Sequence, residues 1–318
     1  IFVRKNASLW PSRSINAQHP KKVLRFFVVF VRGGNRATSG ALATGYLFPP
    51  GGALQWPSNT PRRDCAVADS LAQQYRDFLK DTVRRSVDFS RTGQGRGQPP
   101  PPVEKPFSPE AVRVSLVQPN QWTEVGPIDL QAAIGNRRSR REFSRTALSI
   151  GELSFLLWAT QGITARLDEA TALRTVPSAG ARHALETYLC VFNVSGLDPA
   201  FYRYLPLEHQ LVLEFHEADA GRKLTRAALG QSFVARSAVT FIWTTIPYRM
   251  EWRYGLAAHK AIALDAGHVC QNLYLACEAI GAGTCAVAAY HQELMDQLLR
   301  IDGNDEFVIY LAPVGKLH

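Results

Sequence analysis

The chain has 318 residues, of which 46% are hydrophobic and 20% are charged, and this length allows one large domain or two smaller ones. The formal charge of +9 is concentrated at the start, because residues 1–68 hold ten Lys or Arg and one acid, whereas residues 69–318 hold 26 of each sign. The main part of the chain therefore carries no nucleic-acid signature, and no stretch approaches the roughly 20 apolar residues of a membrane span.

The first 68 residues are rich in Arg, Pro and Gly and show no sustained helical or strand period. They begin without a methionine. We expect them to be a basic, disordered leader, or upstream sequence that is not a natural part of the protein.

The chain has five cysteines, Cys65, Cys190, Cys270, Cys277 and Cys285. They form no CxxC pair and show no metal-ligand spacing with histidine. Their odd number and their apolar neighbours predict reduced, buried thiols in a cytoplasmic protein, and no metal site.

Three further regions follow the leader. Apolar residues recur at helical spacing over 69–92, which predicts a helical segment. Residues 93–106 contain the run GQGRGQPPPP, whose composition indicates an extended spacer, or less often an SH3-type ligand. No linker interrupts 107–318, which we expect to be one domain.

Within this domain, Asp129 is placed to cap a short helix that ends at Gly135-Asn136, and Ser149 to Glu152 form a capping box that opens a second helix. Strand patterns are found at 186–194, 201–205, 210–215, 237–245 and 307–312. Helical patterns cover 261–280, which is apolar on nearly all sides, and 293–299. These elements predict an α+β fold with a central, mostly antiparallel sheet surrounded by helices, one of them long and buried.

Three separated segments are candidates for one binding site. Arg137, Arg138, Ser139 and Arg141 offer forked donors and a hydroxyl suited to a phosphate, although a solvated charge run is the common alternative. Ser178, Ala179 and Gly180 are small residues that let a flat ligand approach the backbone, or form a plain turn. Gly281, Ala282, Gly283 and Thr284 follow the long helix, as a loop with available backbone N–H groups or as a simple helix end.

Tyr248 and Trp252 belong to an aromatic and cationic cluster before the long helix. We expect them to contact substrate, with ordinary packing as the alternative. No nucleophile motif is present and the histidines lack convincing partners, so no catalytic side chain is assigned.

The order of these motifs carries a resemblance. R-R-S-x-R-x-F, then P-S-A-G, then A-G-H-V-C-Q-N-L running into G-A-G-T-C, and a final Pro-Val-Gly resemble the FMN-dependent nitroreductase family over about 125–318. The chain is most similar to the SagB/ThcOx-type dehydrogenase branch, whose members include oxidases of azoline rings in modified peptides. The resemblance implies a nitroreductase-like fold and an intertwined homodimer with bound FMN.

By the same resemblance, the arginine motif holds the FMN phosphate, ribityl chain and pyrimidine edge, and Lys316 adds a phosphate contact. Ser178 to Gly180 line the flavin and substrate side, and Gly281 to Thr284 approach the isoalloxazine. The flavin then performs ping-pong hydride or electron-pair transfer, with a small molecule or a modified peptide as substrate and NAD(P)H as a possible electron donor. A flavin-binding protein without turnover, and a nucleic-acid-binding protein acting through its leader, are the alternatives.

Overall fold

The computed structural model describes residues 66–318, with side chains from residue 70 onward, and these residues belong to one compact unit. Expectations for the leader up to residue 65, including its charge and Cys65, lie outside this part of the chain. The other four cysteines are buried and unpaired. Burial raises the pKa of the Cys270 thiol to about 12 and raises that of Cys277 as well, so both thiols are protonated.

A seven-stranded sheet forms the centre, in the order β1-β6-β5-β4-β7-β9-β8. Its strands are β1 (Arg113–Ser115), β4 (Leu185–Val191), β5 (Phe201–Leu205), β6 (Gln210–Phe215), β7 (Val239–Thr245), β8 (Ala282–Thr284) and β9 (Phe307–Lys316). Every neighbouring pair is antiparallel, which confirms the predicted sheet. A separate antiparallel hairpin joins β2 (Ile163–Arg166) to β3 (Ala172–Arg174).

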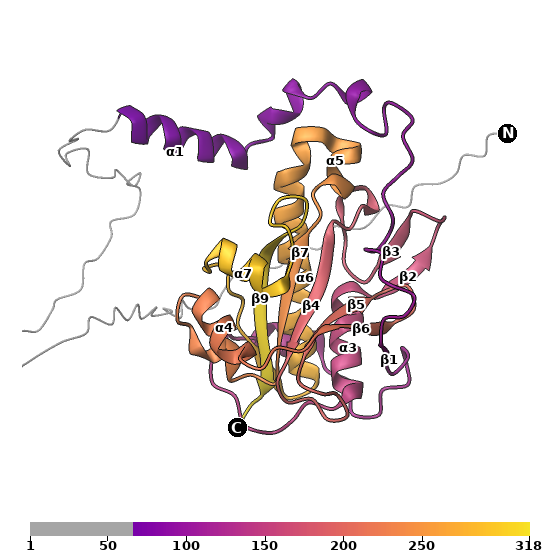
Figure 1. Ribbon diagram of the computed structural model, residues 1–318, viewed down its shortest axis with the longest axis vertical. Helices are drawn as coiled ribbons and strands as arrows, with labels where there is room; N and C mark the ends of the chain where they lie inside the picture. The colour runs from indigo at the N-terminus through magenta and orange to yellow at the C-terminus, as the bar shows by residue number, and fades with distance from the viewer. Residues whose placement is uncertain (1–65) are drawn as a thin grey trace, which may run out of the picture. The chain divides into compact units, whose positions relative to one another are not determined.

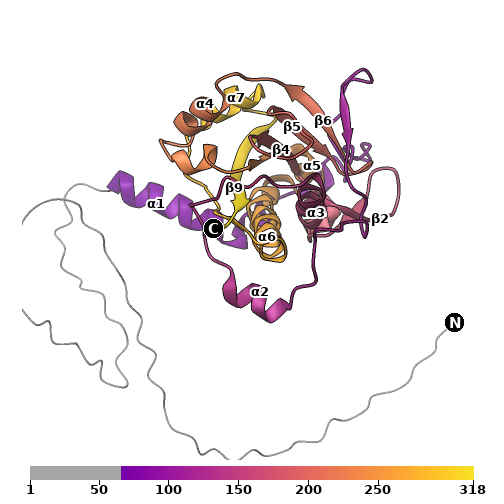
Figure 2. The same ribbon diagram turned by 90° about the horizontal axis from the view of Figure 1, so that it is seen from below.

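Helices cover both faces of the sheet (Figure 1; Figure 2). The described chain contains α1 (Ala66–Leu79), α2 (Leu130–Asn136), α3 (Ile150–Gln161), α4 (Ala220–Ala227), α5 (Tyr248–Tyr254), α6 (Ala258–Ala279) and α7 (Gln292–Leu299), with short 3-10 turns η1 (Asp81–Ser86), η2 (Phe89–Arg91), η3 (Ala179–Ala181), η4 (Ser232–Ala235) and η5 (Gly255–Ala257). Helices α3 and α6 lie on one face, and α4 and α7 lie on the other.

The sequence signals that begin two of these helices act as expected. Ser149 and Glu152 form the capping box of α3, with reciprocal bonds between each side chain and the other residue's backbone N–H. Asp129 caps α2 by accepting a hydrogen bond from the Ala132 N–H at 2.8 Å. The two caps fix the chain on either side of the arginine motif.

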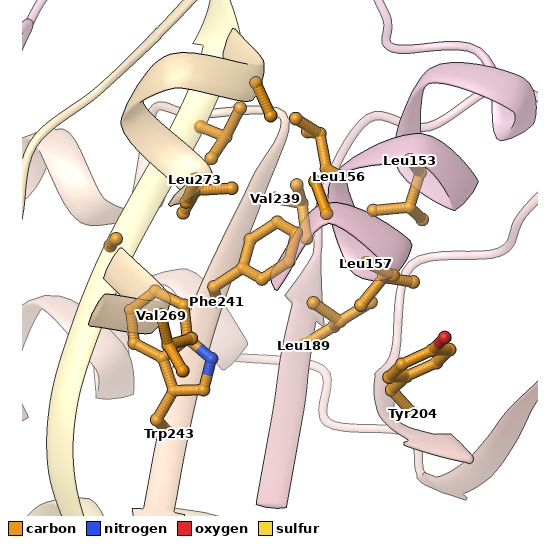
Figure 3. Packing of buried hydrophobic residues seen from close by; sticks show 14 of the residues in the cluster. Leu153, Leu156, Leu157, Leu189, Tyr204, Val239, Phe241, Trp243, Val269 and Leu273 are labelled. Atoms are coloured by element: carbon orange, nitrogen blue, oxygen red, sulfur yellow. The ribbon is translucent and has the colours of Figure 1, made fainter. Parts of the chain in front are cut away.

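The larger core fills the space between α3, α6 and the sheet (Figure 3). Leu153, Leu156 and Leu157 of α3 face Leu189 of β4, while Val269 and Leu273 of α6 lie near Phe241 and Trp243 of β7. These side chains are almost fully buried. A second cluster lies under α4 and α7, on the other face.

Helix α6 is buried along most of its length, as predicted, but one of its faces is exposed. Ala263, Leu264, Gly267, His268 and Gln271 are exposed and recur at helical spacing, and Leu264 is 56% exposed. The sequence pattern of this helix is apolar on nearly all sides, whereas the single chain covers only part of the helix surface. The uncovered face is therefore a candidate contact surface.

The stretch 93–106, predicted to be a spacer, packs against the domain. The carbonyls of Lys105 and Pro106 accept hydrogen bonds from the Arg203 guanidinium at 2.9 and 3.2 Å, and that of Val103 accepts one from Arg174 at 2.8 Å. The Lys105 N–H donates to Glu186 at 2.8 Å. The proline run lacks donors of its own, and buried arginines satisfy the carbonyls that follow it.

Glu186 lies at the centre of this anchorage. It is 4% exposed and pairs with Arg249 at 2.6 Å and with Arg203 at 3.5 Å. Burial alone would raise the pKa of Glu186, but Arg249, Arg203 and Arg174 together hold it below its usual value. The carboxylate is therefore charged, and three buried guanidinium groups stabilise its negative charge.

No helix between residues 66 and 318 is long and apolar enough to cross a membrane. Within the same range, no three His, Cys, Asp or Glu side chains are grouped as metal ligands.

Candidate functional site

The arginine motif leaves the end of α2 and runs beside β8. Ser139 forms a parallel bridge with Thr284, and the Arg140 N–H donates to the Thr284 carbonyl at 2.9 Å. The first and third predicted segments, 145 residues apart in sequence between Ser139 and Thr284, therefore lie side by side. The structure brings these two parts of the candidate site together.

Tyr274 of α6 joins the two segments. Its hydroxyl lies 2.9 Å from Ser139 Oγ and accepts a hydrogen bond from the Ala286 N–H at 2.8 Å. The Arg137 guanidinium lies over the Tyr274 ring, 5.2 Å from its centroid. The tyrosine thus fixes both the hydroxyl and one guanidinium of the arginine motif.

The arginines of the motif have no carboxylate partner within residues 66–318. Arg138 donates only to the carbonyls of Gly135 and Arg137, at 2.9 and 2.7 Å, and Arg141 lies over the Phe233 ring. Arg138, Ser139 and Arg141 are exposed. Three guanidinium groups thus have donors available for an anion.

The predicted glycine-rich loop is strand β8, not a loop. Gly281 has a φ of 61° and follows the helix end, while Ala282, Gly283 and Thr284 are buried and paired with β9. A Cβ on Gly283 would lie 2.7 Å from Arg140 Cβ, so the glycine makes room for the arginine motif. Another group does approach the backbone closely at this glycine, but in the single chain that group is the arginine side chain and not a flat ligand.

Thr284 has a buried hydroxyl without a hydrogen-bond partner in the described chain. An unpaired buried hydroxyl is costly, and it lies at the point where the arginine motif meets β8. The contact between the arginine motif and β8 therefore encloses a polar group that is unpaired in the single chain.

The second predicted segment lies farther along α6. Ser178 Oγ accepts a hydrogen bond from the His183 N–H at 2.9 Å, and Gly180 has a φ of 59° with the Tyr254 hydroxyl 2.5 Å from where its Cβ would be. Ala181 and His183 also have positive φ, of 52° and 43°. Backbone strain at non-glycine residues is concentrated here, as it often is at functional sites.

Asp265 of α6 faces this segment. It is 7% exposed, and its Oδ2 has no hydrogen-bond partner in residues 66–318. Burial raises the pKa of Asp265, against weaker opposing interactions with the Ser178 side chain and the Ala179 backbone. Asp265 and Tyr274 are nine residues apart on one helix, about 13 Å along its axis. The second segment is thus not in direct contact with the other two.

Lys316, predicted to contact phosphate, is engaged elsewhere in the single chain. It lies in β9 rather than beyond it, and its ammonium binds the Glu152 carboxylate and the Ile280 carbonyl, the latter at 2.5 Å. The lysine ties the last strand to the start of α3 and the end of α6.

The two predicted substrate residues lie on α5. Trp252 is 7% exposed, its indole N–H donates to the Gln98 carbonyl at 3.1 Å, and the Arg182 guanidinium lies over its ring. Tyr248 is 51% exposed and lies 3.3 Å from the Gln98 side-chain oxygen. Trp252 thus holds the chain near residue 98, while Tyr248 lines an open cavity of about 460 Å³.

Sequence reasoning missed Tyr274 and Asp265. Both lie within the long helix, where an aromatic residue or a single acid in an apolar pattern gives no signal of its own. Their position beside the quoted motif was the only available hint, because Asp265 directly precedes A-G-H-V-C-Q-N-L and Tyr274 directly follows it.

Comparison with known proteins identifies the class. The profile of the Nitroreductase family matches residues 134–316, more than half of the chain, and the chain belongs to this family. It is 34% identical over 196 residues to MJ1384 of Methanocaldococcus jannaschii, whose name describes a nitroreductase, covering 62% of this chain and 95% of that protein. Family membership agrees with the α+β architecture and classes the chain among oxidoreductases.

Two further similarities are more distant. The trifolitoxin operon protein TfxC of Rhizobium leguminosarum bv. trifolii is 25% identical over 234 residues, covering 68% of this chain and 63% of that protein. A crystal structure from Anabaena variabilis, described as that of a nitroreductase, has a TM-score of 0.54 and 26% identity, covering 66% of this chain and 42% of that one. The chain spans less than two thirds of the length of either protein.

Proposed function

We propose that the chain is an FMN-dependent oxidoreductase whose flavin site is built on the contact between the arginine motif and β8. The observation that carries this proposal is the meeting of the arginine motif with β8 at Ser139 and Thr284, where Tyr274 holds the Ser139 hydroxyl and the Arg137 guanidinium. Flavin phosphate is a dianion rich in acceptor oxygens, and guanidinium groups without carboxylate partners are matched to it.

The described residues fit such a cofactor. The Arg137 guanidinium lies over the Tyr274 ring, and Arg138 and Arg141 are exposed beside it. Ser139 Oγ is positioned by the Tyr274 hydroxyl. Bound FMN would supply two-electron transfer, while these side chains bind and orient it. Lys316 would bind the phosphate together with these residues only by giving up its contact with Glu152.

We assign the substrate side to the strained segment Ser178 to Gly180. Burial raises the pKa of Asp265 there, and its Oδ2, which has no hydrogen-bond partner in the described chain, has capacity for one polar partner. Tyr248 and Trp252 lie on α5, and we propose that Tyr248 contacts substrate while Trp252 positions the chain around it.

A homodimer completes the proposal. The exposed face of α6 and the exposed apolar residues Ile128, Leu130 and Ile134 around α2 border the arginine motif. An apolar groove of about 470 Å³ runs between α3 and α6, lined by Phe155, Trp158 and Leu275 among others. A second copy that covers these surfaces would bury the site from water. Analytical ultracentrifugation tests this, and a monomer at micromolar concentration contradicts it.

For the reaction, the resemblance to SagB/ThcOx-type dehydrogenases and the similarity to TfxC support oxidation of a modified peptide, in the cytoplasm, by a ping-pong route. Reduction of nitro compounds or quinones with NAD(P)H is the second candidate, favoured by the similarity to MJ1384. Anaerobic reduction of the bound flavin by NADH or NADPH separates the two. Bound flavin that no donor reduces would indicate a binding protein without turnover.

The experiment that tests the site is the visible spectrum of the purified protein and of a variant carrying Arg138→Ala and Ser139→Ala. We expect flavin bands in the wild type and their loss in the variant, with far-UV circular dichroism unchanged because both side chains are exposed. Arg145→Ala, an exposed arginine just beyond the motif, is the matched control and should keep its flavin. A colourless wild type that takes up no added FMN refutes the proposal.

A further inference from the structure

A second anion-binding arrangement lies on the face of the sheet opposite α6. A pocket of about 260 Å³ opens between α4, α7 and the segment that follows β6. Leu294 and Leu298 contribute apolar lining, and Lys223, Arg226 and Arg300 contribute positive charge. Helices α4 and α7 lie on the far side of the sheet from α6 and α2, so this pocket is separate from the arginine motif (Figure 2).

Arg300 is held in place at this pocket. It ends α7 in the left-handed region, with a φ of 58° and a ψ of 35°, where glycine is the favoured residue. Its guanidinium lies 3.9 Å from the centroid of Phe215, and that ring stacks at 4.7 Å on the fully buried Phe201. Stacking occupies the face of the guanidinium and leaves its N–H edges for a ligand.

The charges around the pocket are unbalanced. Glu217 is its only lining carboxylate, and it pairs with Lys223 at 2.7 Å. Arg226 and Arg300 are exposed, and neither forms an ion pair with a carboxylate of the described chain. Three cations and one acid leave an excess of about two positive charges.

We propose that this pocket binds a phosphate group. Guanidinium groups from α4 and from the end of α7, together with the Lys223 ammonium, approach from different elements, which suits an anion with three or more acceptor oxygens. A carboxylate would be satisfied by one arginine fork. The excess charge matches the roughly two negative charges of a phosphate at neutral pH. The volume admits a small phosphate ester whose carbon chain contacts the two leucines.

Arg300→Gly tests the proposal without the usual ambiguity of an unfolded variant. Glycine suits the positive φ, which offsets the loss of the contact with Phe215, so we expect the variant to fold while it loses one guanidinium. We expect isothermal titration calorimetry at constant ionic strength to show phosphate affinity about tenfold lower or worse in this variant, and likewise in Arg226→Gln. Arg222→Gln is the matched control, because Arg222 lies on the same helix, pairs with Asp219 and does not line the pocket.

Two probes distinguish the source of the phosphate. Inorganic phosphate and glycerol 3-phosphate are titrated into the full chain. Tighter binding of the ester, lost in Arg300→Gly, supports a phosphate ester as the ligand, whereas equal affinities with the same loss support free phosphate. Wild-type affinity in both Arg300→Gly and Arg226→Gln, or no binding by the wild type, overturns the proposal. The result does not depend on the flavin site, because a variant without Arg138 and Ser139 should bind phosphate here unchanged.

Discussion

Glu104→Gln should make the protein less sensitive to rising pH. Glu104 is 8% exposed, and its carboxylate accepts a hydrogen bond from the Leu207 N–H at 3.2 Å. Burial raises the pKa of Glu104 from 4.5 to about 7, with Glu208 and Glu186 adding to the effect and Arg174 opposing it. At neutral pH the folded chain therefore holds a buried carboxyl that is half ionised.

The sign follows from linkage. Because the folded pKa is raised, the stability contributed by the protonated acid is complete below 4.5 and is lost as the pH rises through about 7. A shift of this size corresponds to about 3 kcal/mol at most, and we expect about 2 kcal/mol because water reaches part of the carboxyl group. Glutamine does not titrate, so the free energy of unfolding of Glu104→Gln should gain about 2 kcal/mol on the wild type between pH 4.5 and pH 8.

Urea denaturation followed by circular dichroism at pH 4.5, 6, 7 and 8 measures this difference. Glu169→Gln, which removes an exposed acid that is not among the groups acting on Glu104, should follow the wild type at every pH. Parallel curves for wild type and Glu104→Gln would refute the reasoning, since they would mean that Glu104 is ionised in the folded state as in water.

Two further changes test the anchorage and the site. Glu186→Gln should lower the free energy of unfolding by about 3–5 kcal/mol in urea denaturation, because Arg249 would remain buried without a counter-charge and Arg203 would keep only Glu214; a loss below 1 kcal/mol would contradict this. Gly283→Ala should cost about 1–3 kcal/mol and weaken flavin binding measured by fluorescence titration, because its Cβ would lie 2.7 Å from Arg140. Unchanged stability and affinity would mean that the arginine motif is free to move.

The regular elements were the most predictable part of the fold. The ranges 201–205 and 210–215 coincide with β5 and β6, because each is a short run of mostly apolar and aromatic residues bounded by turn residues. Strand β9 extends four residues beyond its predicted end at 312, through Pro313. Proline usually ends a strand, but here residue 313 aligns with Thr240 of β7 while β8 pairs only with residues 314–316.

The stretch 93–106 was less predictable. Its composition is that of a spacer, and the arginines that bind it come from β3 and β5, far away in sequence. A single charge inside a strand pattern does not reveal its partner. The candidate site was predicted in part for the same reason, since the motifs are local but the contact of Ser139 with Tyr274 is not.

The position of β9 has a consequence for synthesis on the ribosome. Strand β9 pairs with β7 on one edge and with β8 on the other, and Lys316 at its end reaches Glu152 of α3. Until residue 316 has emerged, β7 keeps an open edge and β8 has no strand partner. Open strand edges attract other chains. Folding of this domain is therefore completed only after translation of its last strand, which closes the open edge of β7 and pairs with β8.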